Sequence, residues 1–235
     1  MAPGVGGDPA SPAAAAPEDL AGMTRTGGQA TRRRLVEEAI RLFGKRGFKG
    51  TSLEAVATAA GVRKQTLLYY FPAKDDLLAA CVEETSRHVA EALTRALEET
   101  PESRKAEAVV HTLFSLAEDW PEFAQFVREA SRLGPDVIER FAGVLEPLRL
   151  RALGFLANGM RTGVIRRQDP ALLLFTLYTA VVGSITEAGV LRAVVGEDES
   201  RLALHRRELE VIAFVRNALA PREGDPTETG AEAAG

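Results

Sequence analysis

Lysine and arginine are concentrated in residues 23–74, where eleven of them stand against three glutamates, although the whole chain has a formal net charge of −4. A basic segment of this kind can neutralise nucleic-acid phosphates. Within it, the run Arg63-Lys64-Gln65-Thr66 carries side chains that can hydrogen-bond to base edges, since Arg and Lys donate to guanine and Gln pairs with adenine. A cluster of basic residues is more often a solvated surface than a nucleic-acid-binding site. The local helix pattern therefore has to decide between these two interpretations.

The elements around this run begin with an amphipathic helix over residues 30–46. Its apolar residues recur at i, i+4, i+7 and i+8 between Leu35 and Phe43, which is the spacing of one buried stripe. Gly47 follows two basic residues and is typical of a left-handed C-terminal cap. The pattern therefore predicts a helix that ends just before Gly47.

Two shorter helices are predicted after it. Thr51 as N-cap with Glu54 at the third helical position forms a capping box that opens the second helix. The turn at residues 60–62 contains a glycine, and a third helix over 63–70 is stopped by Pro72. Two short helices joined by such a turn and packed on a longer first helix form a helix-turn-helix.

One stretch of about a fifth of the chain, from Arg32 to Leu78, matches a known pattern at many positions in order and without a gap. The matching segments are Ala39-Ile40-Arg41-Leu42-Phe43, Gly47-Phe48, Thr51-Ser52-Leu53, Val56-Ala57, Ala60-Gly61-Val62, Thr66 through Lys74, and Leu77-Leu78. This stretch resembles the DNA-binding domain of the tetracycline-repressor (TetR) family.

The resemblance implies two sets of DNA contacts. The residues expected at base edges are Arg63, Lys64, Gln65 and Thr66. The residues expected at phosphates are Thr51, Ser52, Tyr69, Tyr70 and Lys74. The chain departs from the family where Leu68 replaces a frequent tyrosine, which passes that phosphate contact to Tyr69, and where Arg63 replaces a frequent capping serine.

An all-α fold is predicted, because Ala, Leu, Arg and Glu are abundant and aromatic residues make up 6%. We expect an N-terminal three-helix helix-turn-helix domain and a larger helical domain for ligand binding and dimerisation. The expected boundaries are a disordered tail over 1–28, the DNA-binding domain over 29–75, the larger domain over 76–220, and a second disordered tail over 221–235. The first tail lacks the pattern of a secretory signal, which predicts a cytoplasmic protein.

Within the larger domain, a helix over 75–99 should connect the two halves, and Pro101, Pro121, Pro135 and Pro147 should separate the helices that follow. Asp169 and Pro170 should open a strongly apolar helix that reaches Val195. Its polar and charged interruptions argue against a membrane span. With a last helix over 199–220 it resembles the family's pair of dimerisation helices, which predicts a homodimer on a palindromic double-stranded DNA operator.

Large apolar residues of this domain are expected to be core in the main, with some lining an effector pocket. The chosen ligand-binding candidates are Trp120, Phe126, Phe155 and Tyr178, and their character favours a small hydrophobic or amphipathic effector. The alternative is a dimeric DNA-binding regulator without an effector. The sequence contains no phosphate loop or nucleophile elbow, a single cysteine and three scattered histidines, so we expect neither catalysis nor a metal or cofactor.

Overall fold

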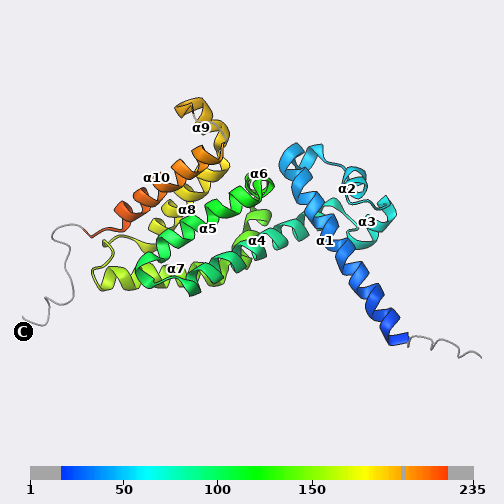
Figure 1. The fold of residues 1–235 in the computed structure, drawn as a ribbon, viewed down its shortest axis with the longest axis horizontal. Helices are drawn as coiled ribbons and strands as arrows, with labels where there is room; N and C mark the ends of the chain where they lie inside the picture. Colours follow the sequence, from blue (N-terminus) through cyan, green and yellow to red (C-terminus); the bar gives the residue numbers. More distant parts are fainter. Residues whose placement is uncertain (1–16, 197–199, 222–235) are drawn as a thin grey trace, which may run out of the picture.

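A computed structural model describes residues 17–196 and 200–221, and these residues form helices without any strand, as the all-α prediction requires (Figure 1). The helices are α1 (Pro17–Gly50), α2 (Leu53–Ala59), α3 (Lys64–Tyr70), α4 (Lys74–Glu99), the 3-10 helix η1 (Glu102–Arg104), α5 (Lys105–Asp119), α6 (Pro121–Ala130), α7 (Pro135–Arg161), α8 (Pro170–Thr186), α9 (Ala188–Val195) and α10 (Arg201–Leu219).

The helices α1, α2 and α3 form a small head at one end of the molecule, and the later helices form a longer body (Figure 1). The head is held by the predicted stripe of α1, which packs against Val56 of α2, Leu67 of α3 and Leu77 of α4. The same cluster continues into the body through Phe126 and Ala130 of α6. Head and body therefore share one hydrophobic core.

The first helix is longer than predicted at its N-terminal end. It begins at Pro17, so the expected tail over 1–28 is wrong for residues 17–28, which are helical. Polar and small residues carry no helical stripe there, which is why periodicity gives no signal. At the other end, Gly47 has φ 76°, and this breaks the helical backbone where the sequence predicted the end of the helix. Residues 1–16 and 222–235 of the two predicted tails lie outside the described residues.

The connecting helix predicted over 75–99 is confirmed as α4. It buries Leu77, Leu78, Val82 and Val89 and leaves the head to run along the body between α5 and α7 (Figure 1). Its first turn is capped by the Asp76 carboxylate, which accepts a hydrogen bond of 2.9 Å from the Ala73 N–H.

The body contains two smaller cores. One joins α5, α8 and α10 around Phe114, and the other joins α7 and α8 around Leu156 and Met160. The prediction that Pro147 separates two helices is wrong, because Pro147 lies inside α7. Both Pro147 and Gly143 are exposed, so water can bind the Gly143 carbonyl that loses its helical partner.

The apolar helix opens as predicted but ends earlier. The Asp169 carboxylate accepts hydrogen bonds from the N–H groups of Ala171 and Leu172 at 2.8 and 2.9 Å, and Pro170 occupies the first turn. The helix does not reach Val195, because α8 ends at Thr186 and the separate helix α9 follows. In Figure 1, α9 projects from the body beyond the end of α10.

Candidate nucleic-acid interface

The α1–α2 connection places Ser52 and Thr51 in different environments. Ser52, not Thr51, is the N-cap of α2, and its hydroxyl accepts a hydrogen bond of 3.1 Å from the Ala55 N–H. Thr51 is only 2% exposed, and its hydroxyl lies 2.9 Å from the Gly47 carbonyl oxygen and 3.2 Å from that of Leu42. The predicted capping box and the predicted phosphate contact of Thr51 are therefore wrong, since its hydroxyl satisfies carbonyls at the end of α1.

A glycine turn sets the angle between α2 and α3. Gly61 has φ 66°, a left-handed conformation that suits glycine, and the Val62 N–H donates to the Ala57 carbonyl at 2.9 Å. Arg63 is the N-cap of α3 but makes no side-chain cap, as expected where arginine replaces a capping serine. The Arg63 side chain is exposed.

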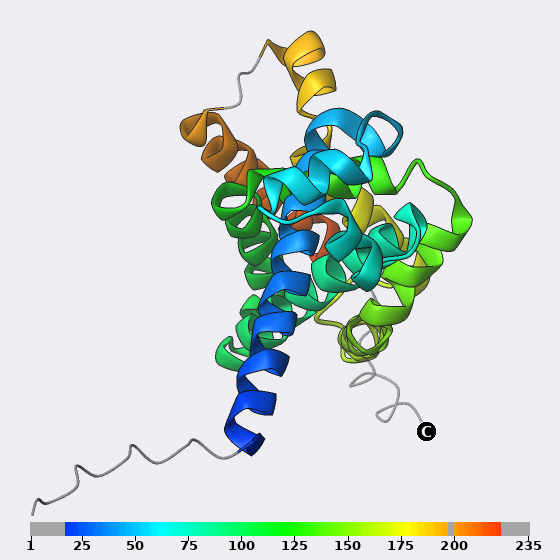
Figure 2. The same ribbon diagram turned by 90° about the vertical axis from the view of Figure 1, so that its right-hand side faces the viewer.

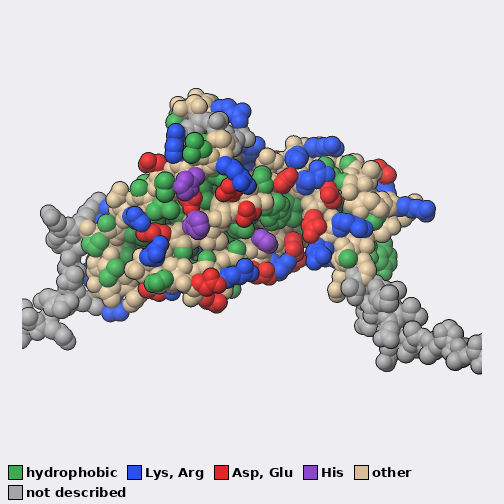
Figure 3. All heavy atoms as spheres, in the orientation of Figure 1, with side chains coloured by type: hydrophobic (Ala, Val, Ile, Leu, Met, Phe, Trp, Pro, Cys, Tyr) green, Lys and Arg blue, Asp and Glu red, His purple; other side chains and the backbone are tan. Residues whose placement is uncertain are grey.

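The first turn of α3 presents polar side chains outward. Arg63, Lys64 and Gln65 are exposed and Thr66 is half-buried, whereas Leu67 is fully buried in the head core. Lys64 Nζ lies 3.7 Å from Glu54 Oε2 in an exposed pair of the kind that contributes little and exchanges easily. The surface in Figure 3 shows Lys and Arg side chains standing out at this end of the molecule.

The two tyrosines at the end of α3 differ in exposure. Tyr69 is 82% exposed, Tyr70 is half-buried, and their rings meet edge to face with centroids 5.2 Å apart. Leu68, at the position where the family often has tyrosine, is 37% exposed. Tyr69 is thus the more accessible of the two phenols.

Lys74 begins α4 and already has a partner within the protein. Its ammonium donates a hydrogen bond to the Phe48 carbonyl and lies 4.3 Å from the centroid of the Phe48 ring. The sequence assigned Lys74 to phosphate alone and missed this role, because Phe48 is distant in sequence. Lys74 therefore ties the start of α4 to the last turn of α1, which follows the kink at Gly47.

A side chain of α6 contacts the same turn of α1 through the Phe48 N–H. Glu129 Oε1 accepts a hydrogen bond of 2.8 Å from the Phe48 N–H. A Cβ added at Gly47 would lie 2.9 Å from this oxygen, so the close approach requires glycine. Lys45 Nζ also pairs with Glu122 Oε1 at 3.4 Å. These contacts fix the head against the body at α6, and no local sequence signal predicted them.

The four ligand-binding candidates are divided among three places, because Trp120 packs against the same head core that encloses Phe126. Phe126 is fully buried in the head core, and Phe155 packs against the core of α7 and α8. Trp120 lies between His88 and Phe123, with ring centroids 5.5 and 5.7 Å away. Tyr178 is 54% exposed on α8. The structure therefore does not bring these residues together around one cavity.

A hollow of about 490 Å³ lies between the α7–α8 connection, α8 and α10, and it includes none of those four residues. Leu172, Thr176 and Phe214 line its apolar part. It lies beside a larger group of exposed apolar side chains on the same two helices. That group comprises Leu172, Phe175 and Tyr178 of α8 and Leu202, Leu209 and Phe214 of α10.

Polar pairs fasten α10 to α5 on its other side. Arg216 Nε lies 2.6 Å from Glu107 Oε1, and this hydrogen bond lowers the pKa of the Glu107 carboxyl. Glu208 is largely buried and has its two carboxylate oxygens 2.6 Å from His111 Nδ1 and 3.3 Å from His205 Nδ1. These pairs leave the apolar side of α10 facing outward.

No group of three or more His, Cys, Asp and Glu side chains within residues 17–196 and 200–221 is arranged to hold a metal ion. No single helix among these residues is long and apolar enough to cross a membrane, although α8 and α9 together, bent by 86°, meet the requirements of length and composition.

Comparison with known proteins agrees with this architecture. Residues 35–81 match the family of bacterial regulatory proteins described as the tetR family. The chain is 26% identical over 168 residues to the HTH-type transcriptional regulator RutR of Escherichia coli K12, across 71% of this chain and 79% of RutR.

Two solved structures share the fold. The regulator FadR of Bacillus subtilis in complex with stearoyl-CoA has a TM-score of 0.68 at 17% identity, covering 80% of this chain and 98% of FadR. AibR in complex with isovaleryl coenzyme A and operator DNA has a TM-score of 0.66 at 19% identity, covering 82% of this chain and all of AibR. With the helix-turn-helix head and the helical body now described, the head matches the tetR family of bacterial regulatory proteins over residues 35–81, and the chain as a whole shares the fold of solved transcriptional regulators.

Proposed function

We propose that the protein is a ligand-responsive transcriptional repressor that binds a palindromic operator as a homodimer in the cytoplasm. The observation that carries this proposal is the exposed first turn of α3. Its three outward side chains, Arg63, Lys64 and Gln65, stand on a helix whose Leu67 anchors it in the head core. An anchored helix with polar residues at its N-terminal end suits insertion into the major groove.

The roles proposed for the head residues follow from their exposure. Arg63 and Lys64 donate to guanine, and Gln65 makes a bidentate contact with adenine. Phosphate contacts come from Ser52, Tyr69, Tyr70 and Lys74, while half-buried Thr66 reaches a base edge from the groove side of α3. Ser52 keeps a hydroxyl proton to donate while its oxygen caps α2.

The homodimer is supported by the exposed apolar face of α8 and α10. Phe175 is 62% exposed and Leu202 is 73% exposed, and burying such side chains against a second copy is favourable by about 25 cal/mol per Å² of apolar area. A two-fold dimer buries the same face of each subunit and presents two heads to a palindrome. Repression follows when the bound dimer covers promoter DNA.

The effector is proposed to be hydrophobic or amphipathic. Structural neighbours bound to stearoyl-CoA and isovaleryl coenzyme A support this class. Phe126 and Trp120 lie at the head core, Phe155 at the core of α7 and α8, and Tyr178 at the surface, and this division favours a second candidate, a dimeric regulator whose DNA binding responds to no small molecule. The two candidates differ only in the effect of ligand on operator affinity.

The test begins with selection of bound sequences from a random duplex pool by the purified protein. We expect a palindrome, and we expect acyl thioesters to weaken binding to it. A palindrome released by no member of an apolar panel would support the second candidate. Failure of folded protein to enrich any sequence would refute the assignment of α3 as a reading helix.

The dimer is tested separately by light scattering on size-exclusion chromatography. Phe175→Asp on α8 should convert dimer to monomer. Leu150→Asp is the matched control, because Leu150 is 56% exposed on α7, outside the face of α8 and α10. Equal dimer fractions for both variants would show that this face is not the interface.

A further inference from the structure

The first helix continues past the packing of the head, and its N-terminal half leaves the other helices (Figures 1 and 2). It touches the far end of α3 on the way. A Cβ added at Gly28 would lie 3.2 Å from the Tyr70 hydroxyl oxygen. One turn later, the Arg32 guanidinium carbon lies 5.2 Å from the centroid of the Phe71 ring. Thus α1 passes the C-terminal end of the helix whose N-terminal end carries the proposed base contacts.

Two arginines of this segment are available to an anion. Arg32 and Arg33 are both exposed. A guanidinium that lies over a ring, as Arg32 does over Phe71, keeps N–H groups available for hydrogen bonds to an anion. Arg33 Nε lies 3.7 Å from Glu37 Oε1, but the two side chains are 72% and 60% exposed. Such an exposed pair contributes about 0–1 kcal/mol, so phosphate can replace the carboxylate.

The length of α3 limits how far these arginines lie from the base contacts. A helix of seven residues is about 10 Å long, so the segment of α1 beside the last turn of α3 lies about that far from its first turn. The major groove of B-DNA is about 12 Å wide and is bordered by phosphates on both sides, so a helix that reads bases in the groove brings side chains at this distance within reach of a phosphate backbone.

We propose that Arg32 and Arg33 bind the DNA phosphates that flank the base pairs read by α3, so that α1 is a second DNA contact beside the helix-turn-helix. This inference rests on the proposed function, since it requires α3 in the major groove. The contact adds affinity and fixes the orientation of the head, and it adds no base preference.

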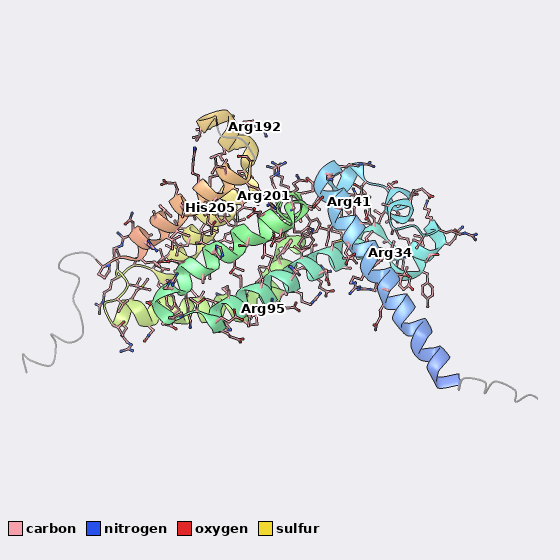
Figure 4. The ribbon with its side chains drawn as sticks, viewed as in Figure 1. Arg34, Arg41, Arg95, Arg192, Arg201 and His205 are labelled. Atoms are coloured by element: carbon pink, nitrogen blue, oxygen red, sulfur yellow. The ribbon has the colours of Figure 1, made fainter. Side chains whose placement is uncertain are left out.

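Arg34 provides a matched control within the same helix. It is exposed, and at 100° per residue it stands 200° around the helix axis from Arg32, on the side away from Phe71 (Figure 4). Its replacement changes the net charge of the protein as much as replacement of Arg32 or Arg33. A difference between the variants therefore reports position and not total charge.

The experiment measures operator affinity as a function of salt concentration for Arg32→Gln, Arg33→Gln and Arg34→Gln in the full chain. Each of the first two should reduce the slope of log K against log salt by about 0.9, the value for one phosphate contact on duplex DNA. Arg34→Gln should leave the slope unchanged. Hydroxyl-radical protection at the outer edge of each half-site should shrink for Arg32→Gln and Arg33→Gln only.

The Arg32→Lys variant guards against a folding defect, because it keeps the positive charge and removes only the guanidinium that lies over Phe71. It should retain the wild-type slope. Wild-type slopes for both glutamine variants, or an equal decrease for all three, would overturn the proposal, the second result because it indicates a general field effect. Absence of any operator binding by the wild-type protein would refute the proposed function instead.

Discussion

Replacement of Glu129 should loosen the joint between head and body by an amount that the structure allows us to work out. The Glu129 carboxylate accepts the Phe48 N–H at 2.8 Å in a partly buried position. A hydrogen bond to a charged group contributes about 1.5–3 kcal/mol, and Glu129→Ala also leaves the Phe48 N–H without its acceptor. For a chain of this size, the expected fall in the thermal unfolding midpoint is about 3–12 °C.

The size of the effect should follow the chemistry of the acceptor. Glu129→Gln keeps an oxygen that can accept the bond without charge, so its midpoint should lie between those of wild type and Glu129→Ala. Glu122→Gln is the control on the same helix, since its pair with Lys45 is 3.4 Å long and partly exposed and is worth about 0–1 kcal/mol. The assay is thermal denaturation followed by circular dichroism at one protein concentration. A Glu129→Ala midpoint no lower than that of Glu122→Gln would refute the reasoning.

Three further predictions concern the head and the α5–α10 contact. Lys74→Ala should reduce the salt slope of operator binding by about 0.9, and an unchanged slope would leave Lys74 with only its structural contact to Phe48. Gln65→Ala should weaken preference at one operator position by about 1–3 kcal/mol, measured by a scan of single base-pair changes, whereas uniform weakening would contradict a bidentate contact. Because Arg216 lowers the pKa of Glu107, this pair stabilises the fold above the unfolded carboxyl pKa of about 4.3 and loses that effect as pH falls through the folded value. Glu107→Gln should therefore lower the unfolding midpoint at about pH 7 and not at about pH 3, and an equal loss at both would contradict the linkage.

Features set by neighbouring residues could be predicted from the sequence. The stop at Gly47, the turn at Gly61 and the cap at Asp169 all depend on backbone geometry within a few residues, and the structure has each of them. The extent of α4 follows from its apolar stripe in the same way. The sequence does not decide between neighbouring residues that suit the same role. Thr51 and Ser52 are such a case, because either residue can be the N-cap of α2.

Partners that are distant in sequence decide the remaining features. Thr51 turns inward because the end of α1 offers it two carbonyls, and this leaves Ser52 as the cap. Residue type alone identifies the four aromatic candidates for ligand binding, and residue type does not determine which helix packs over each ring. The packing of α8 leaves Tyr178 exposed, and the packing of α6 encloses Phe126.

The peptide of Phe48 shows how such distant contacts join the two halves of the protein. Its carbonyl accepts from Lys74 at the start of α4, and its N–H donates to Glu129 on α6. Both partners lie on helices that continue into the body, whereas Phe48 lies in the last turn of α1, directly after the kink at Gly47. A displacement of α6 relative to α4 must therefore break one of the two hydrogen bonds or move this last turn. Since Ser52 follows the last turn of α1 and caps α2, moving that turn moves the head residues that are proposed to hold phosphate.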